Sequence, residues 1–158
     1  MASNEMTKCR HRLVQYCRGK GLDLGCGNEK ITPMAMGIDL EGGDKDLTMD
    51  AGDLGMFAPG YFDYIFSSHC LGYFLDTEKI LKQWWRVLRL NGYLVLYLPH
   101  KDFRPKSGDI LHDFISRDIL KILKKFARFE TVRAEDQNSG DEYSFDLVVK
   151  KTSMQVKP

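Results

Sequence analysis

The chain lacks long apolar runs. No stretch of its 158 residues approaches the roughly 20 apolar residues that are needed to span a bilayer. It also lacks a charge imbalance, because the formal net charge is only +1, and a broad basic face for nucleic acid is not expected. Internal repeats and low-complexity segments are missing as well. We therefore expect one globular domain with no membrane or nucleic-acid partner, in line with the roughly 100–200 residues typical of a domain.

Cysteine is scarce. The four cysteines are Cys9, Cys17, Cys26 and Cys70, and no secretory signal pattern precedes them, so we expect the reduced thiols of a cytoplasmic protein. Cys9, His11 and Cys17 could be imagined as zinc ligands. A fourth ligand at usable spacing is missing, and the segment reads as a helix. The sequence therefore predicts no metal site.

Helical and strand patterns alternate along the chain. Helices are predicted over 5–18, 77–90 and about 116–127, with Asn91-Gly92 ending the second and Ser116 as the N-cap of the third. Strands are predicted at 20–24, 35–39, 47–49, 61–66, 93–98, 128–134 and 143–150, with a loop over 100–114.

This alternation predicts an α/β fold with a doubly wound, mostly parallel sheet. The last two predicted strands are joined by a short polar turn, so one of them should run antiparallel. The expected organisation is a single domain over 1–158: an N-terminal helix in 1–19, a cofactor-binding sheet domain in 20–150 and a flexible tail in 151–158.

The most informative stretch is Gly21-Leu22-Asp23-Leu24-Gly25-Cys26-Gly27-Asn28. A buried strand here ends in two glycines, which lets a ligand approach the main chain at the carboxyl edge of the sheet. The third glycine of a G-x-G-x-x-G pattern is missing, since Lys30 stands there. The segment 28–36 is also too short for a whole crossover helix. The helix N-terminus that would hold a pyrophosphate is therefore reduced or missing, which disfavours NAD.

Acidic residues follow the next predicted strands. Asp39 could accept two hydrogen bonds from a ribose diol. Asp50 and Asp53 flank a polar turn whose carboxylates and amides could bind an adenine edge. Taken separately, each acid is more often a turn or cap residue.

Taken together and in order, these segments resemble the class I S-adenosylmethionine-dependent methyltransferases. More narrowly, the chain is similar to the small bacterial type 11 methyltransferases with a shortened first crossover. The resemblance covers roughly residues 20–150 and implies a Rossmann-like fold, S-adenosylmethionine as cofactor and methyl transfer as activity. The segments that carry it are 23–27, 37–40, 50–51, 62–69, 86–94 and 97–100.

Carried over position by position, the resemblance implies a cofactor site. Asp23, Gly25 and Gly27 would line the methionine and ribose part, although Asp23 could instead bond loop amides. Asp39 would take the ribose hydroxyls. The predicted site is completed by Asp50 and the Ala51 amide at the adenine, Asp53 nearby, Ser68 on the methionine side, and the neighbours Cys26 and Leu40.

The chain departs from this group at one point. The group usually has Leu-Glu-His where this sequence has Leu71-Gly72-Tyr73. The lost acid and histidine would have stood near the acceptor. This departure leaves open either a different acceptor or a loss of activity.

Candidates for a general base are His69, His100 and His112, which are expected at the carboxyl edge of the sheet. His69 is preferred because it directly follows Ser68. Each of the three could instead be a hydrogen-bonded loop residue. Residues 100–114 are expected to cover the acceptor pocket. Trp84 and Trp85 are expected in the core, with stacking on an acceptor sugar as the alternative.

The sequence thus predicts an S-adenosylmethionine-dependent methyltransferase acting on a small-molecule or carbohydrate-type acceptor. The main alternative is a catalytically inactive module that binds S-adenosylmethionine within a biosynthetic assembly. A nucleotide-dependent oxidoreductase is a third hypothesis.

Overall fold

The computed structural model describes residues 5–106 and 108–158. Residues 1–4 of the predicted N-terminal segment and residue 107 of the predicted loop lie outside these ranges.

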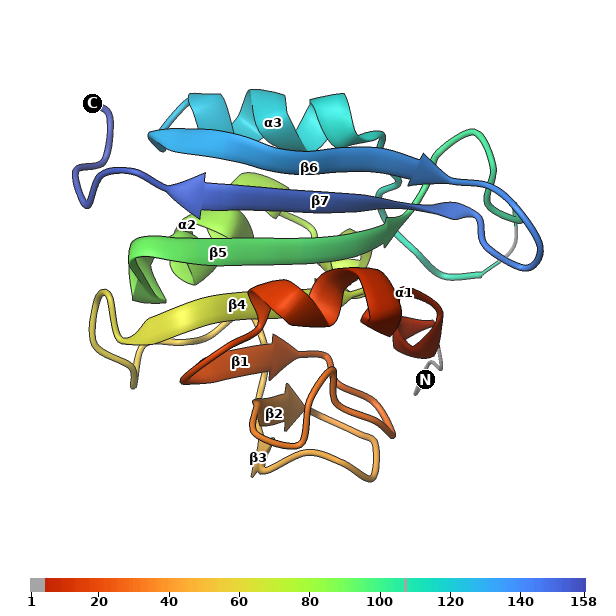
Figure 1. Cartoon of the computed structure of the whole chain (residues 1–158), viewed down its shortest axis with the longest axis horizontal. Coiled ribbons are helices and arrows are strands. Elements are labelled where there is room, and N and C mark those ends of the chain that lie inside the picture. Colours follow the sequence, from red (N-terminus) through yellow and green to blue (C-terminus); the bar gives the residue numbers. More distant parts are fainter. Residues whose placement is uncertain (1–4, 107) are drawn as a thin grey trace.

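The strands form one seven-stranded sheet in the order β3-β2-β1-β4-β5-β7-β6 (Figure 1). β1 lies near the middle and pairs in parallel with β2 and β4, and β4 pairs in parallel with β5. β7 runs antiparallel to both of its neighbours, which confirms the expected fold class. The strands are β1 (Gly21–Leu24), β2 (Met36–Asp39), β3 (Leu47–Thr48), β4 (Phe62–Ser68), β5 (Leu88–Pro99), β6 (Phe129–Gln137) and β7 (Ser144–Lys151).

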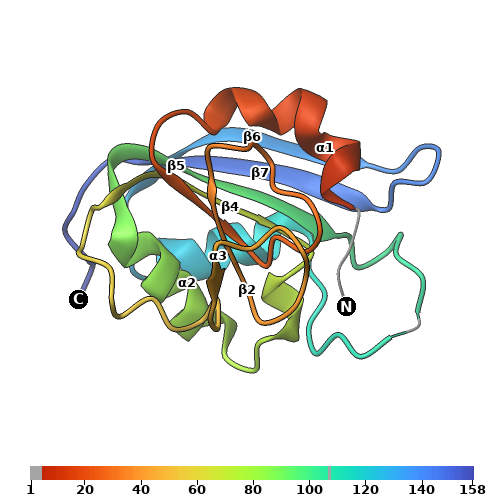
Figure 2. The same ribbon diagram turned by 90° about the horizontal axis from the view of Figure 1, so that it is seen from below.

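Helices cover both faces of the sheet, unequally. α1 (Met6–Leu13) lies on one face, and α2 (Thr77–Val87) and α3 (Ser116–Lys124) lie on the other (Figure 2). Two short 3-10 turns, η1 (Val14–Tyr16) and η2 (Leu71–Tyr73), complete the elements. Each face has its own apolar core: Cys9, Leu13 and Tyr97 contribute under α1, and Leu22 and Trp84 contribute under α2 and α3.

The first crossover contains no helix. Residues 25–35 run from β1 to β2 as turns and bends, as expected from the length of this segment. The Asp23 carboxylate accepts a hydrogen bond from the Ile31 N–H at 2.7 Å, and the Asp44 carboxylate accepts one from the Lys30 N–H at 2.8 Å. These side-chain acceptors satisfy amides that no helix uses.

The predicted end of the second helix is wrong. α2 ends at Val87, and Leu88–Leu90 belong to β5. The Lys151 ammonium, from the end of β7, donates to the carbonyls of Trp85 and Leu88 and so satisfies the helix terminus. Asn91, with φ 64°, bends β5 instead of capping a helix. The local sequence around the helix cannot predict this contact, because Lys151 lies more than 60 positions away.

The third helix also begins differently from the prediction. Ile115 is its N-cap residue and Ser116 is already helical, while the Asp118 carboxylate accepts the Ile115 N–H at 2.9 Å. In the expected tail 151–158, Lys151 belongs to β7 and is buried. Further along, the Lys157 N–H donates to the Phe126 carbonyl at 2.8 Å.

The parallel strands all end at one edge of the sheet, on the right in Figure 1. The loop over 100–114 and the turn between β6 and β7 gather at the same edge. Such an edge is where open α/β sheets bind ligands.

Candidate active site

The glycine turn after β1 is held by the end of β2. Gly25 has φ 72° and its N–H donates to the Ile38 carbonyl at 2.7 Å. Gly27 has φ 62° and its N–H donates to the Asp39 carboxylate at 2.8 Å. A Cβ at Gly25 would lie 2.7 Å from Cys70 Sγ, so glycine keeps this space open.

A hollow of about 270 Å³ opens beside this turn. The Ser68 hydroxyl is buried there and has no hydrogen-bond partner among the described residues. A buried hydroxyl without a partner costs free energy, so this group is ready to bond a ligand. The hollow is lined by Gly25, Asp39, Ser68, His69, Cys70, Tyr73 and Asp109.

Asp39 projects into this hollow while it also supports the turn. One of its carboxylate oxygens accepts the Gly27 N–H, and the other accepts the Glu41 N–H at 3.2 Å. A carboxylate has about four acceptor positions, so capacity remains for hydroxyl groups of a ligand. Residues with the chemistry to hold a ribose and a methionine chain therefore line the hollow.

Other predicted cofactor residues lie away from this hollow. Asp23 is buried beneath the turn, where its carboxylate holds the Ile31 amide, and burial raises its pKa to about 7. Cys26 is buried, and Leu40 is exposed. Asp23 therefore acts on the turn and not directly on the space beside it.

Asp50, Ala51 and Asp53 form a turn that follows β3. Asp50 and Asp53 each accept a backbone N–H two residues further along the chain. Ala51 is buried and its carbonyl accepts the Trp84 Nε1–H at 2.8 Å. Trp84 and Trp85 are buried in the core, so their predicted packing role is confirmed and stacking on an acceptor is excluded.

His69 lies at the end of β4, in the left-handed region with φ 51°. Its Nε2 is hydrogen-bonded to the Ser144 hydroxyl at 2.8 Å, and its ring stacks on Tyr97 with centroids 5.2 Å apart. Burial, assisted by the positive charge of Lys8, lowers the pKa of His69 to about 3. The imidazole is therefore neutral at physiological pH.

The other two candidate histidines hold loops together. His100 is buried, its Nδ1 accepts the Asp102 N–H at 3.1 Å, and its ring stacks on Phe103 at 3.8 Å. His112 Nε2 is hydrogen-bonded to the Leu75 carbonyl at 2.9 Å. Neither lines the hollow beside the glycine turn.

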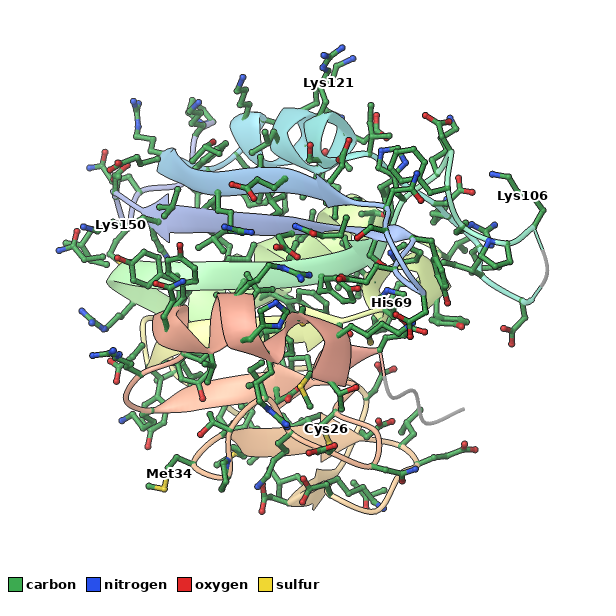
Figure 3. All side chains as sticks on the ribbon, turned by 45° about the vertical axis from the view of Figure 1, so that its right-hand side comes forward. Cys26, Met34, His69, Lys106, Lys121 and Lys150 are labelled. Atoms are coloured by element: carbon green, nitrogen blue, oxygen red, sulfur yellow. The ribbon has the colours of Figure 1, made fainter. Side chains whose placement is uncertain are left out.

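A second hollow, of about 170 Å³, adjoins the first beneath the loop 100–114. Three residues line both spaces: His69, Tyr73 and Asp109. In Figure 3, His69 lies between Cys26 of the glycine turn and Lys106 of the loop. The second hollow is otherwise lined by Pro99, Arg104, Pro105, Gly108, Ile110 and Tyr143.

The loop that roofs this second hollow is docked on Gly72. The Leu111 and His112 N–H groups both donate to the Gly72 carbonyl, at 2.9 and 3.0 Å. A Cβ at Gly72 would lie 2.5 Å from Ile110 Cδ1 and would also collide with the His112 carbonyl. The departure Leu71-Gly72-Tyr73 therefore makes room for the loop.

Sequence reasoning missed Asp109 and Tyr143 as lining residues. Asp109 lies in the loop 100–114 and Tyr143 directly before β7, and neither belongs to a recognisable motif. In the sequence, 37 positions separate Asp109 from Gly72. The one sequence feature that pointed to this region was Gly72, which suggested that the residues around the acceptor differ from those of the family.

No group of three or more potential metal ligands is found in residues 5–106 and 108–158. Within the same ranges no helix is long and apolar enough to cross a membrane.

Comparison with known proteins agrees with this arrangement. Residues 22–96 match the type 11 family described as a methyltransferase domain. No curated protein sequence matches the chain significantly. A Burkholderia thailandensis 1,6-didemethyltoxoflavin N1-methyltransferase, solved with 1,6-didemethyltoxoflavin and S-adenosylhomocysteine, aligns with TM-score 0.73 at 14% identity, over 95% of this chain and 79% of its own.

Two further solved structures share the fold. A Thermotoga maritima protein described as a possible histamine N-methyltransferase aligns with TM-score 0.65 at 16% identity, over 95% of this chain and 96% of its own. An Aquifex aeolicus S-adenosylmethionine-dependent methyltransferase aligns with TM-score 0.64 at 17% identity, over 84% of this chain and 82% of its own.

The sheet order and the glycine turn, with these likenesses, define a class I methyltransferase fold. The match over residues 22–96 covers a little under half of the chain and is to the type 11 group, as expected from the sequence. Together with the shared fold, it supports an S-adenosylmethionine-dependent methyltransferase.

Proposed function

We propose that this enzyme transfers a methyl group from S-adenosylmethionine to a small-molecule or carbohydrate-type acceptor. The observation that carries the proposal is the pair of adjoining hollows that share His69, Tyr73 and Asp109. One hollow has the glycine turn and the Asp39 carboxylate of a cofactor site, and the other is roofed by a loop. Two molecules bound in adjoining spaces can react by proximity alone, which supplies much of such a rate.

The chain's own residues would hold the cofactor as follows. Asp39 takes the ribose hydroxyls, Gly25 and Gly27 give the main chain close approach, and Ser68 bonds the methionine part. Asp23 keeps the turn in shape through Ile31. When bound, the cofactor supplies an electrophilic methyl group on a positively charged sulfur.

The adenine end of the site is proposed on family likeness. Asp50, the Ala51 amide and Asp53 would lie at the adenine, and Cys26 and Leu40 would flank the cofactor. Their turn follows β3, which is next to β2 and therefore next to Asp39.

His69 is proposed to contact the acceptor, since it lines both hollows. Its neutral ring is fixed by Ser144 and Tyr97. A ring with a pKa of about 3 is a weak base at neutral pH, so these contacts favour an orienting role over the general-base role first assigned to it.

The size of the second hollow supports a small acceptor. About 170 Å³ is close to the roughly 150 Å³ cavity that holds one benzene molecule. Tyr73 and Tyr143 offer rings for stacking, and Arg104 offers a cation. The Burkholderia neighbour acts on a compact heteroaromatic compound, which favours a similar class here. The inactive-module alternative is disfavoured because the chain keeps a space on the acceptor side.

The test has two stages. Calorimetry with S-adenosylmethionine and S-adenosylhomocysteine should show binding of both. Incubation with a panel of single-ring aromatic amines, nitrogen heterocycles and monosaccharides should then release S-adenosylhomocysteine with at least one of them. Failure to bind either ligand would overturn the proposal, whereas binding without any turnover across the panel would favour the inactive module.

A further inference from the structure

Asp109 is a carboxylate at the junction of the two hollows. It lines both of them, together with His69 and Tyr73. These two neighbours are a neutral imidazole and a phenol, so among the three shared residues only Asp109 carries a charge. Its carboxylate makes no hydrogen bond or ion pair with the described residues, unlike Asp39, whose two oxygens hold backbone amides.

The position of Asp109 follows from the glycine at position 72. Gly72 accepts hydrogen bonds from Leu111 and His112, two and three residues beyond Asp109. The salt bridge between Arg104 Nε and Asp113 at 3.0 Å fastens the loop across its base. The docked loop thus brings the Asp109 carboxylate beside η2, where it lines both hollows together with Tyr73.

We propose that Asp109 is a catalytic residue that attracts the cationic donor and accepts the proton of the acceptor's nucleophile. This inference rests on the proposed function and deepens it, because it requires an acceptor that carries an N–H or O–H group. The acceptor's lone pair forms the new bond to the methyl carbon. The carbon–sulfur bond breaks with its electron pair on sulfur, and the proton passes to the Asp109 carboxylate and then to solvent.

Few other side chains at the junction of the two hollows can accept a proton. His69 Nε2 is engaged by Ser144, and the Tyr143 hydroxyl donates to Glu5 at 3.1 Å. Burial raises the pKa of the Cys70 thiol to about 12, so its thiolate is not populated at neutral pH. The guanidinium of Arg104 offers only hydrogen-bond donors and no acceptor. Asp39, across the cofactor hollow, is the other carboxylate there, and it is engaged by Gly27 and Glu41.

The experiment compares binding of S-adenosylmethionine, which is cationic at sulfur, with binding of S-adenosylhomocysteine, which is not. Calorimetry is carried out on the full chain as wild type, Asp109→Asn, Asp109→Glu and the matched control Asp102→Asn. Asp102 belongs to the same loop, is exposed and lines neither hollow. The Asn variant should lose about three- to tenfold of affinity for S-adenosylmethionine relative to S-adenosylhomocysteine, as expected for one exposed charge.

The Glu variant should keep most of this preference, and Asp102→Asn should match the wild type. Added salt should shrink the preference of the wild type, because an exposed charge is screened. If Asp109→Asn keeps the wild-type preference, the inference is overturned while the proposed function stands. If the wild type binds neither ligand, the proposed function fails, and the inference fails with it. Thermal unfolding of each variant separates a loss of fold from a loss of charge.

Discussion

Two aspartates near the glycine turn have different roles because they are buried to different extents. Asp39 is half-buried, lines the hollow beside the glycine turn and holds Gly27. Asp23 is buried, and its carboxylate serves the Ile31 amide. One acid therefore faces the ligand space, and the other maintains the turn that shapes it.

Replacing Asp39 by alanine should weaken binding of S-adenosylhomocysteine by about 1–3 kcal/mol, because a ligand hydroxyl and the Gly27 amide would both lose an acceptor. Calorimetry measures the change. Asp102→Ala, which removes an equal charge away from the hollow, should leave the affinity unaltered. Equal losses in both variants would argue against a ribose contact at Asp39.

Asp23 makes stability depend on pH in an unusual direction. Burial raises its pKa from 3.8 to about 7, so the folded state binds a proton that the unfolded state has released between these values. The contribution of Asp23 to stability is thus greatest below about pH 4 and falls as the pH rises towards 7. Asp23→Asn keeps an oxygen for Ile31 and removes this titration.

The stability of Asp23→Asn relative to the wild type should therefore increase with pH from about 4 to 7, by at most about 1.4 kcal/mol for each pH unit. Urea unfolding of both proteins at several pH values measures the difference in free energy of unfolding. A difference that is constant across this range would show that Asp23 is ionised in the folded state.

At the scale of elements, the loop 100–114 and η2 act as a unit. The loop reaches the site because Gly72 has no side chain where Ile110 and His112 pack. Gly72→Ala should force the loop away, lower the free energy of unfolding by about 1–3 kcal/mol and speed tryptic cleavage at the exposed Lys101 and Lys106.

Limited proteolysis and urea unfolding measure these effects of Gly72→Ala. Gly43→Ala is the matched control, since a Cβ there would make only an ordinary contact with Asn28, at 3.5 Å. If both variants resist trypsin equally, docking on Gly72 does not hold the loop.

At the scale of the whole molecule, α1 is the only described helix on its face, and a charged network fastens it to β7. Arg12 donates to Glu142 at 2.7 Å and to Asp146 at 2.7 Å. Asp146 is fully buried and also accepts from Arg133 and Gln137. Arg12 therefore links α1 to two carboxylates at once, beside the apolar contacts of Cys9 and Leu13.

Arg12→Ala should lower the free energy of unfolding by about 2–4 kcal/mol, because it leaves the buried Asp146 and the half-buried Glu142 with fewer partners. Urea unfolding measures the loss. Arg18→Ala removes an equal charge from an exposed position in the same N-terminal segment and should cost less than about 0.5 kcal/mol. A similar small cost for Arg12→Ala would show that apolar packing alone holds α1.

Local patterns in the sequence determined the alternation of elements, the parallel sheet and the missing crossover helix. They also pointed to Gly25, Asp39, Ser68 and His69, which all line the hollow beside the glycine turn. These features follow from periodicity, glycine turns and acids at strand ends, which act over a few residues. The order of the motifs then carried the family resemblance.

Tertiary structure alone decided the rest. α2 ends where Lys151 reaches it from the far end of the chain. Asp109 and Tyr143 join His69 only because a loop docks on Gly72 and a turn closes beside it. Contacts between residues far apart in sequence depend on the three-dimensional packing of side chains, and no local pattern encodes them.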